Sequence, residues 1–452
     1  MGMREESDSL GSVLVESKRY WGAQTQRSLQ YFEIGSERFT WPFIDALIRI
    51  KKAAALANHS LAALDDARCK LIVNACDSLL DDPEQSFQEF PLSVWQTGSG
   101  TQTNMNANEV IANRANEIAG AQLGSKSPIH PNDHVNMSQS SNDIFPSAMH
   151  LVTIMVTRER LLPALTNLSN TLADKQQQFQ EIKTVGRTHM MDAVSLTVGE
   201  FLSGFVDQLE KARANIACAL GALHSLAIGG SAVGNGVNTP PGFAESFCRG
   251  LKKEMGMDFD HSGNKFSALS GQDDILGFHA SLKQLATVLF KLANDTRFLA
   301  SGPRCGIGEW LLPENEPGSS IMPGKINPTQ CEALSMVAVQ VIANDVAVTF
   351  ASASGHLQLN VYRPLIIYNV MQSIQLLSDS MSSFDQNCLR GLQLNNEKIQ
   401  TNLQRNLMDI TRLVPDLGYD AAANIAKYAH QNNLAIREAA TILGFEDQLP
   451  KT

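Results

Sequence analysis

The sequence predicts an all-α protein in which long helices form a bundle, with smaller helical domains at the N- and C-terminal ends. Four or five segments place apolar residues at three- and four-residue steps over lengths beyond those of ordinary globular helices. Little strand-like alternation lies between these segments. Such apolar helices are typical of a bundle shared between subunits, although a large monomeric helical protein would show the same periodicity.

The composition indicates a soluble globular protein with more than one compact unit. The chain has 452 residues, of which 43% are hydrophobic and 18% charged, and its formal net charge is −10. This acidic balance argues against nucleic acid or an anionic membrane as a partner. We expect no secretory signal, because Met1–Asp8 carries charges of both signs and leads into no apolar run. We expect no membrane span, because polar residues interrupt the most apolar segment, Ser335–Phe350. Seven cysteines without Cys-x-x-Cys spacing favour reduced thiols, a cytoplasmic location and the absence of a metal site.

Taken in order, the first 137 residues are expected to form an N-terminal domain. Apolar residues from Phe43 to Leu80 follow the spacing of an amphipathic helix pair. Pro83 and Pro91 then bracket an irregular piece.

The central domain, residues 138–394, should hold the long helices. Asp143 stands where an N-cap would precede a helix that runs to Leu172, with a kink expected at Pro163. Further helical patterns are expected over 198–216, 275–292, 334–342 and 367–377. The glycine-rich stretch Ala227–Asn238 lacks the setting of a dinucleotide site and is interpreted as a linker. Residues 395–452 have shorter, more polar patterns and should form a small C-terminal helical domain.

Three polar stretches stand out: Val94–Asn106, in which nearly all side chains are small and polar, His130–Asn142 and Gly186–Asp192. So many hydroxyl and amide groups are difficult to satisfy in a core but are useful in a binding site. The alternatives are a solvated loop for the first stretch, a turn with an N-cap for His130 and Asp133, and a capping or surface histidine for His189. The first stretch also lacks the Gly-Lys-Ser/Thr ending of a P-loop.

A fourth stretch, Gly318–Pro328, reads Gly-Ser-Ser-Ile-Met-Pro-Gly-Lys-Ile-Asn-Pro. Its glycines and prolines exclude a helix and predict a loop. Such a loop can turn successive backbone N–H groups toward one point and hold an anion there, for example a serine alkoxide or a carboxylate. An ordinary turn between helices is the alternative.

Several motifs in a fixed order resemble those of the class II fumarases, a branch of the fumarase/aspartase superfamily. They are Trp21–Arg27, Gln96–Thr101, His130–Asp133, Ser140–Asn142, Gly186–His189, Ser301–Glu309 and the 318–328 loop with the Thr-Gln-Cys-Glu-Ala that follows it. The resemblance covers essentially the whole chain. It implies a metal-independent hydro-lyase without a cofactor, which adds water to fumarate reversibly and stereospecifically to give L-malate in the tricarboxylic acid cycle. It also implies a homotetramer with a shared multi-helix core and active sites that each draw on three subunits.

The resemblance further implies roles for individual residues. Ser319 would be the base that removes the carbon-bound proton, and His189, paired with Glu332, would be the other acid/base partner. The groups that would hold the substrate are Ser99, Gly100, Thr101, Ser140, Ser141, Asn142, Thr188, Ser320, Lys325 and Asn327. His130, Pro131, Asn132 and Asp133 would form a secondary anion site.

The chemistry explains these residue types. Removal of a proton beside a carboxylate produces an aci-carboxylate, whose extra negative charge Lys325, Asn327 and the clustered hydroxyls would stabilise. Loop N–H groups and Lys325 would make the Ser319 hydroxyl a better base. His189, or a water that it holds, would protonate the leaving hydroxide.

The chain departs from the family pattern at two places. Met191 stands where the family usually has Gln, which predicts a change in the ordering of water at the site. Ser127 and Pro128 precede His130 where a basic residue is usual, and Lys126 lies slightly further away, which predicts a weaker secondary anion site.

Two other functions remain open from the sequence. A sister lyase such as aspartase or argininosuccinate lyase would share the base but expel an amine; Gly324 and Gln330-Cys331-Glu332 favour the hydratase. A helical assembly without catalytic activity is the other, and the joint presence of Ser319, His189, Lys325 and Asn327 argues against it.

Overall fold

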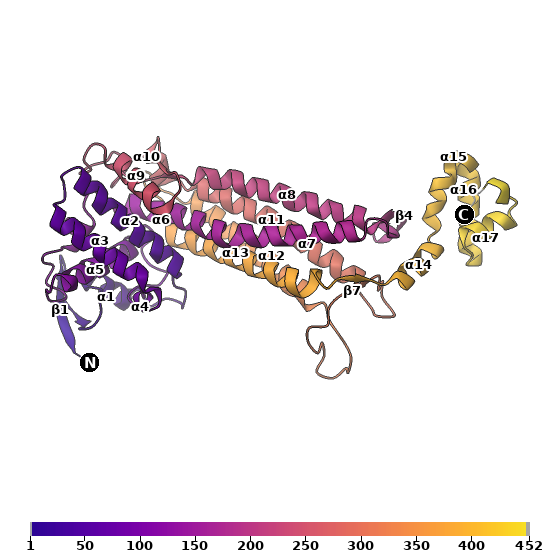
Figure 1. Cartoon of the computed structure of the whole chain (residues 1–452), viewed down its shortest axis with the longest axis horizontal. Coiled ribbons are helices and arrows are strands. Elements are labelled where there is room, and N and C mark those ends of the chain that lie inside the picture. Colours follow the sequence, from indigo (N-terminus) through magenta and orange to yellow (C-terminus); the bar gives the residue numbers. More distant parts are fainter. Residues whose placement is uncertain (1, 449–452) are drawn as a thin grey trace. The chain divides into compact units, whose positions relative to one another are not determined.

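The computed structural model describes residues 2–448, and helices dominate it, as the periodicity predicts (Figure 1). By contacts the chain divides into two compact units. Unit 1 consists of Met1–Leu161, Ala214–Lys283 and Gln340–Leu376, and unit 2 consists of Leu162–Arg213, Gln284–Val339 and Leu377–Thr452. Both units therefore combine segments that are far apart in the sequence. The division at 137/138 and 394/395 stays a prediction.

Unit 1 is organised around α2 (Trp41–Ser60), which packs against its neighbours α3, α5, α6 and α9. Phe43 on α2 contacts Phe39 and Phe145, with ring centroids 4.8 and 5.0 Å apart. The helix pair expected between Phe43 and Leu80 is confirmed as α2 and α3. The elements of this unit are β1 (Met3–Asp8), β2 (Gly11–Glu16), α1 (Ala23–Tyr31), α3 (Asp66–Asp81), α4 (Pro83–Phe87), α5 (Thr101–Ile118), η1 (Pro131–Val135), α6 (Ser141–Val156), η2 (Thr157–Leu161), β5 (Ser225–Leu226), α9 (Phe243–Met255), β6 (Asp260–His261) and α10 (Lys265–Ser270).

Four long helices contribute residues to both units: α8 (Val198–Ala222), α11 (Asp273–Leu299), α12 (Thr329–Ala353) and α13 (Arg363–Phe384). Together with α7 (Leu162–Gln178) they confirm the long helical patterns. By length and composition α12 could cross a membrane, but the core helix of a soluble protein passes the same test. Within the chain, 39% of the most apolar window of α12 is buried. Most of this apolar window of α12 is therefore not buried by the rest of the chain.

The C-terminal part of unit 2 has a small core of its own. Ile410, Ala422, Ile425, Ala429 and Ala439 are buried together there. This agrees with the expected change to shorter helices after Leu394. The elements are η3 (Asp385–Leu389), β8 (Gln393–Leu394), α14 (Asn396–Arg405), η4 (Leu407–Leu413), α15 (Val414–Leu417), α16 (Tyr419–Asn432), α17 (Ile436–Ile442) and η5 (Glu446–Gln448).

Local structure differs from the sequence expectation at several points. Ser140, rather than Asp143, is the N-cap of α6, and Asp143 completes a capping box at the third helical position. The irregularity expected at Pro163 is the π-turn η2, which ends just before it. The Val94–Asn106 stretch is not simply a loop, because α5 begins at Thr101. Lys183–Thr188 and Met191–Thr197 form the β3–β4 hairpin, where the sequence predicted a polar turn before a helix.

Candidate functional site

The loop between β7 (Trp310–Leu311) and α12 aims two backbone N–H groups at the Ser319 hydroxyl. Ile321 N and Met322 N donate to Ser319 Oγ over 3.3 and 2.9 Å. Gly318 N donates to Lys325 O over 2.9 Å, which closes the loop. An oxygen that accepts two N–H groups is stabilised when it carries negative charge. The geometry is that of the anion cradle expected from the sequence.

The other candidate residues of this region surround the cradle. Asn327 donates its side-chain amide to Gly318 O, so it supports the loop. Ser320, Lys325 and Glu332 are exposed, the last in the first turn of α12. In the described part of the chain Lys325 and Glu332 have no ion pair, so the expected pairing of Glu332 with His189 stays a prediction.

His189 lies at the tip of the β3–β4 hairpin with Met190, and Thr188 ends β3. Both tip residues have left-handed backbones, with φ of 55° and 66°. Two such residues match the twist of a tight hairpin, although side chains other than Gly, Asn and Asp rarely adopt this conformation. The turn therefore presents an exposed imidazole at the end of a short, rigid arm.

Arg187 anchors this arm by a buried ion pair. Its guanidinium lies 2.6 and 3.1 Å from the two carboxylate oxygens of Glu309, whose side chain is 1% exposed. Thr184 Oγ1 and Asn402 Nδ2 donate to the same carboxylate. Burial alone would raise the pKa of Glu309, but these donors outweigh it and hold the pKa below its ordinary value. Arg187 thus positions the hairpin, which explains its place beside Thr188 and His189.

We expect Glu309→Gln to destabilise the protein by about 1–3 kcal/mol, because it removes the charge from a buried, hydrogen-bonded pair. Since the folded-state pKa is lowered, the carboxylate's contribution is present above the unfolded value of 4.5 and is lost as the pH falls through the folded value. The difference in melting temperature between wild type and variant should therefore shrink below about pH 4.5. Glu314→Gln, an exposed carboxylate of the neighbouring loop, should leave the melting temperature unchanged.

In unit 1, Ser99, Gly100 and Thr101 form a turn at the start of α5. Ser99 Oγ and Thr101 Oγ1 are 2.8 Å apart. Gly100 has φ of 77°, and a Cβ there would lie 2.1 Å from the Phe145 ring, so only glycine fits. The residue before this turn is held by the backbone of Arg363, whose N–H donates to Gly98 O over 3.0 Å.

A second turn, residues 139–142, starts α6 and connects with the first. Asn104 Nδ2 on α5 donates to Ser141 Oγ over 3.0 Å. Asn142 Nδ2 donates to Ala232 O over 2.7 Å. Asp143 accepts the Ser140 N–H and thereby fixes the turn. The structure therefore brings the two predicted groups of unit 1 together through Asn104.

The sequence reasoning missed Lys51 and Asn104, which support these turns. Lys51 Nζ donates to Asn136 Oδ1 and Gln139 Oε1 over 3.0 and 2.9 Å, and the side chain is fully buried. The available signal was a lysine on the apolar face of α2, one turn after Leu47.

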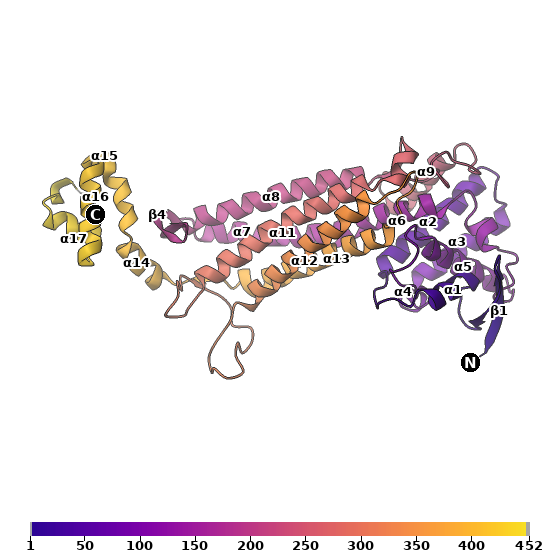
Figure 2. The same ribbon diagram turned by 180° about the vertical axis from the view of Figure 1, so that it is seen from behind.

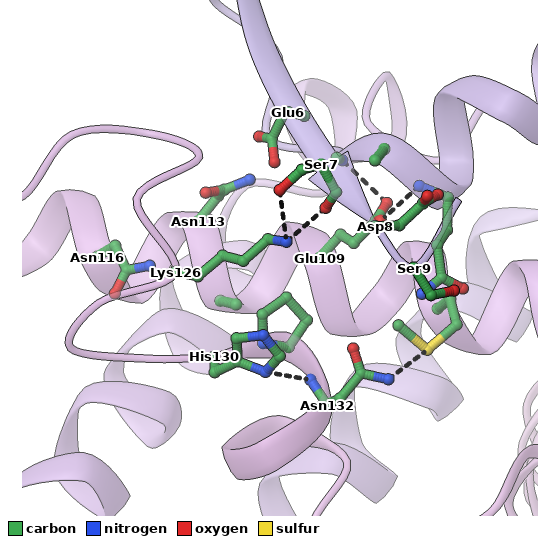
Figure 3. Close-up of a pocket in the computed structure, with 16 residues that line it drawn as sticks. Glu6, Ser7, Asp8, Ser9, Glu109, Asn113, Asn116, Lys126, His130 and Asn132 are labelled. Carbon is green, nitrogen blue, oxygen red and sulfur yellow. Dashed lines mark hydrogen bonds between the residues drawn. The ribbon is translucent and has the colours of Figure 1, made fainter. Parts of the chain in front are cut away.

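Three of the four expected secondary anion residues, His130, Pro131 and Asn132, line a cavity of about 290 Å³ within unit 1, whereas Asp133 is not among its lining residues (Figure 3). His130 Nδ1 accepts the N–H groups of Asn132 and Asp133 over 3.2 Å each, which leaves the proton of the neutral ring on Nε2. Lys126 also lines the cavity, but its ammonium donates to the Ser7 carbonyl, and Glu6 and Asp8 line the same space. The cation is therefore engaged by the N-terminal strand, and the expectation of a weaker anion site stays a prediction.

The candidate residues are divided between the two units. Ser99–Thr101 and Ser140–Asn142 belong to unit 1, whereas Thr188, His189 and the 318–332 residues belong to unit 2. Within unit 2 the β3–β4 hairpin and the loop after β7 lie apart in both views (Figures 1 and 2). His189 lies at the tip of that hairpin, and Ser319 lies in that loop.

Comparison with known proteins gives a consistent assignment. The lyase family model matches residues 11–343, and the model of the fumarase C C-terminus matches residues 410–451. A class II fumarate hydratase of Thermosynechococcus vestitus is 54% identical over 98% of this chain and 94% of its own length, and one of Pseudomonas syringae is 53% identical over 98% and 95%. The crystal structure of the class II fumarase from Schistosoma mansoni has a TM-score of 0.96 and 43% identity, covering 98% of this chain and 96% of its own. The chain belongs to the family of class II fumarate hydratases.

Proposed function

We propose that Ser319 is the base of a fumarate hydratase that interconverts fumarate and L-malate. In the dehydration direction the Ser319 alkoxide takes a proton from the carbon beside one carboxylate of malate, and the electron pair moves into that carboxylate to form the aci-carboxylate. The carbon–oxygen bond of the hydroxyl group then breaks, and His189 supplies the proton that releases it as water. The observation that carries this proposal is the pair of N–H groups donated to Ser319 Oγ.

Charge development explains the remaining roles. The aci-carboxylate carries more negative charge than the substrate, so Lys325 and Asn327 stabilise the intermediate more than the ground state. Ser320 and Thr188 stand beside the reacting groups, and the hydroxyls and amides of Ser99–Thr101 and Ser140–Asn142 hold the dicarboxylate. Glu332 orients the His189 ring. No metal or cofactor takes part in this scheme.

The shared-site tetramer is part of the same proposal. On α12 the exposed residues Met336, Val339, Val346 and Phe350 are 54–71% exposed and follow one another at helical spacing, so they form one apolar face. Such a face in a soluble protein fits contact with other copies of the chain. Active sites composed from several subunits also explain why one chain keeps His189 and Ser319 apart.

Subunit mixing tests the shared site. Co-expressed Ser319→Ala and His189→Asn chains should regain about a quarter of wild-type activity. In a random mixture each site has about a one-half chance of an intact Ser319 and, independently, about a one-half chance of an intact His189 from another subunit. Each variant expressed alone should stay inactive. Mixed tetramers without activity would contradict sites that take these two residues from different subunits.

The activity itself is tested with fumarate in plain buffer. Purified protein should lower the ultraviolet absorbance of fumarate without added metal, nucleotide or ammonia, since water is the co-substrate. Loss of absorbance only when ammonia is present would move the assignment to an ammonia lyase such as aspartase. We further propose a cytoplasmic location and a role in the tricarboxylic acid cycle, which fit the family and the free cysteines.

A further inference from the structure

Two fully buried basic residues of unit 1, Lys51 and Arg363, are hydrogen-bonded next to the two turns. Lys51 on α2 and Arg363 at the start of α13 each have an exposed fraction of 0%. Lys51 is bonded to Asn136 and Gln139, so it touches the residue immediately before Ser140. Arg363 donates its backbone N–H to Gly98, immediately before Ser99. Lys51 therefore contacts the 139–142 turn through its ammonium, whereas Arg363 contacts the residue before Ser99 through its backbone and directs its guanidinium to Leu269 O.

The charge of these cations is incompletely balanced. Asp143, also fully buried, acts electrostatically on both of them. Neither cation lies within salt-bridge distance of a carboxylate in the described residues. Nε and Nη1 of Arg363 have no hydrogen-bond partner, and only Nη2 is engaged, with Leu269 O over 2.8 Å. In their charged forms, these two cations and one carboxylate would carry a net positive charge of one unit.

Such an arrangement costs free energy in the protein alone. Burial lowers the pKa of Lys51 to about 7 and that of Arg363 to about 9, so water would be the preferred surroundings of both cations. Burial likewise raises the pKa of Asp143. This rise is opposed by the charge of Lys51 and by the N–H groups of Ser140, Ser231 and Gly229, all of which lower the pKa. Buried charges that lack a partner are usually removed from cores. Their presence next to two turns rich in hydroxyl and amide groups indicates that an anion completes the balance.

We propose that Lys51 and Arg363 are positioning residues whose buried charges draw a dianionic dicarboxylate to the Ser99–Thr101 and Ser140–Asn142 turns. This inference rests on the proposed binding role of those turns. The cations do not touch the substrate; their field acts across the turns through a medium of low polarity, where it is weakly screened. Because the proposed function gives the stabilisation of the developing charge to Lys325 and Asn327, the field of Lys51 and Arg363 should act mainly on binding of the dianion, lowering KM and leaving kcat nearly unchanged.

Charge and hydrogen bonding can be separated by the choice of variants. Lys51→Gln retains a donor for Asn136 or Gln139 without the charge. Arg363→Met removes the charge, and Arg363→Lys retains it. Lys52→Gln is the matched control, because Lys52 is the next residue on α2 but is paired with Asp77 and Glu254 over 2.7 and 2.9 Å.

We expect Lys51→Gln and Arg363→Met each to raise KM for fumarate about tenfold or more at pH 6.5, with kcat within about threefold of wild type. The dissociation constant of succinate, a non-reacting dianion, should rise by the same factor in calorimetry. Arg363→Lys and Lys52→Gln should stay within about threefold of wild type in both quantities.

A KM for Lys51→Gln no higher than that of Lys52→Gln would overturn the proposal, as would a loss confined to kcat. If Arg363→Met does not fold, the KM values of Lys51→Gln and Arg363→Lys still test the proposal. Ser99→Ala separates this inference from the proposed function. If Ser99→Ala raises KM and the charge variants do not, the turns bind substrate without help from the buried cations. If Ser99→Ala leaves KM unchanged, the binding role of the turn itself is wrong.

Discussion

Replacing Ser319 by alanine should lower kcat roughly 10²- to 10⁴-fold, the range expected for loss of a general base. The hydroxyl is held by two loop N–H groups, so its removal takes away the one atom in the cradle that can accept the carbon-bound proton. The loop should survive, because Gly318, Lys325 and Asn327 close it independently of the hydroxyl. Initial rates with fumarate and with L-malate measure the effect in both directions.

Ser320→Ala is the matched control for this change. It removes the same atoms from the neighbouring residue, which the proposal places in substrate binding. We therefore expect a higher KM and a much smaller decrease in kcat than for Ser319→Ala. Equal kcat values for the two variants would contradict the assignment of Ser319 as the base. Sedimentation should show the same oligomer for both variants and wild type.

Replacing His189 by asparagine should lower kcat by about 10²-fold or more, because the leaving hydroxide loses its proton donor. Asparagine is the appropriate replacement at this position. The backbone of His189 is left-handed, with φ of 55°, and asparagine tolerates this conformation better than most residues. The hairpin tip should therefore keep its shape while the imidazole is lost.

Met190→Asn controls for the tip itself. Met190 has the same left-handed backbone, with φ of 66°, and is exposed. Activity close to wild type in this variant, together with loss in His189→Asn, would locate the effect in the imidazole. A similar loss in both would mean that the shape of the tip, and not the imidazole, supports turnover.

Much of this protein was determined by its sequence alone. Helical periodicity in long apolar segments predicted the helix-rich fold, because spacing of three and four residues is a local property of the chain. Glycine and proline in Gly318–Pro328 predicted a loop that can hold an anion, and its N–H groups do meet at Ser319 Oγ. The ordered motifs predicted the fumarase family, which the comparisons confirm.

Tertiary structure decided what depends on contacts between distant residues. The β3–β4 hairpin was missed because Thr184 and Arg187 are held by Glu309, more than a hundred positions later, and no local pattern reports such a partner. Lys51 lies within the amphipathic pattern predicted over Phe43–Leu80, and only packing shows that its ammonium reaches Asn136 and Gln139. Burial, charge balance and the separation of His189 from Ser319 arise in three dimensions, because they depend on what surrounds a side chain and not on its neighbours in sequence.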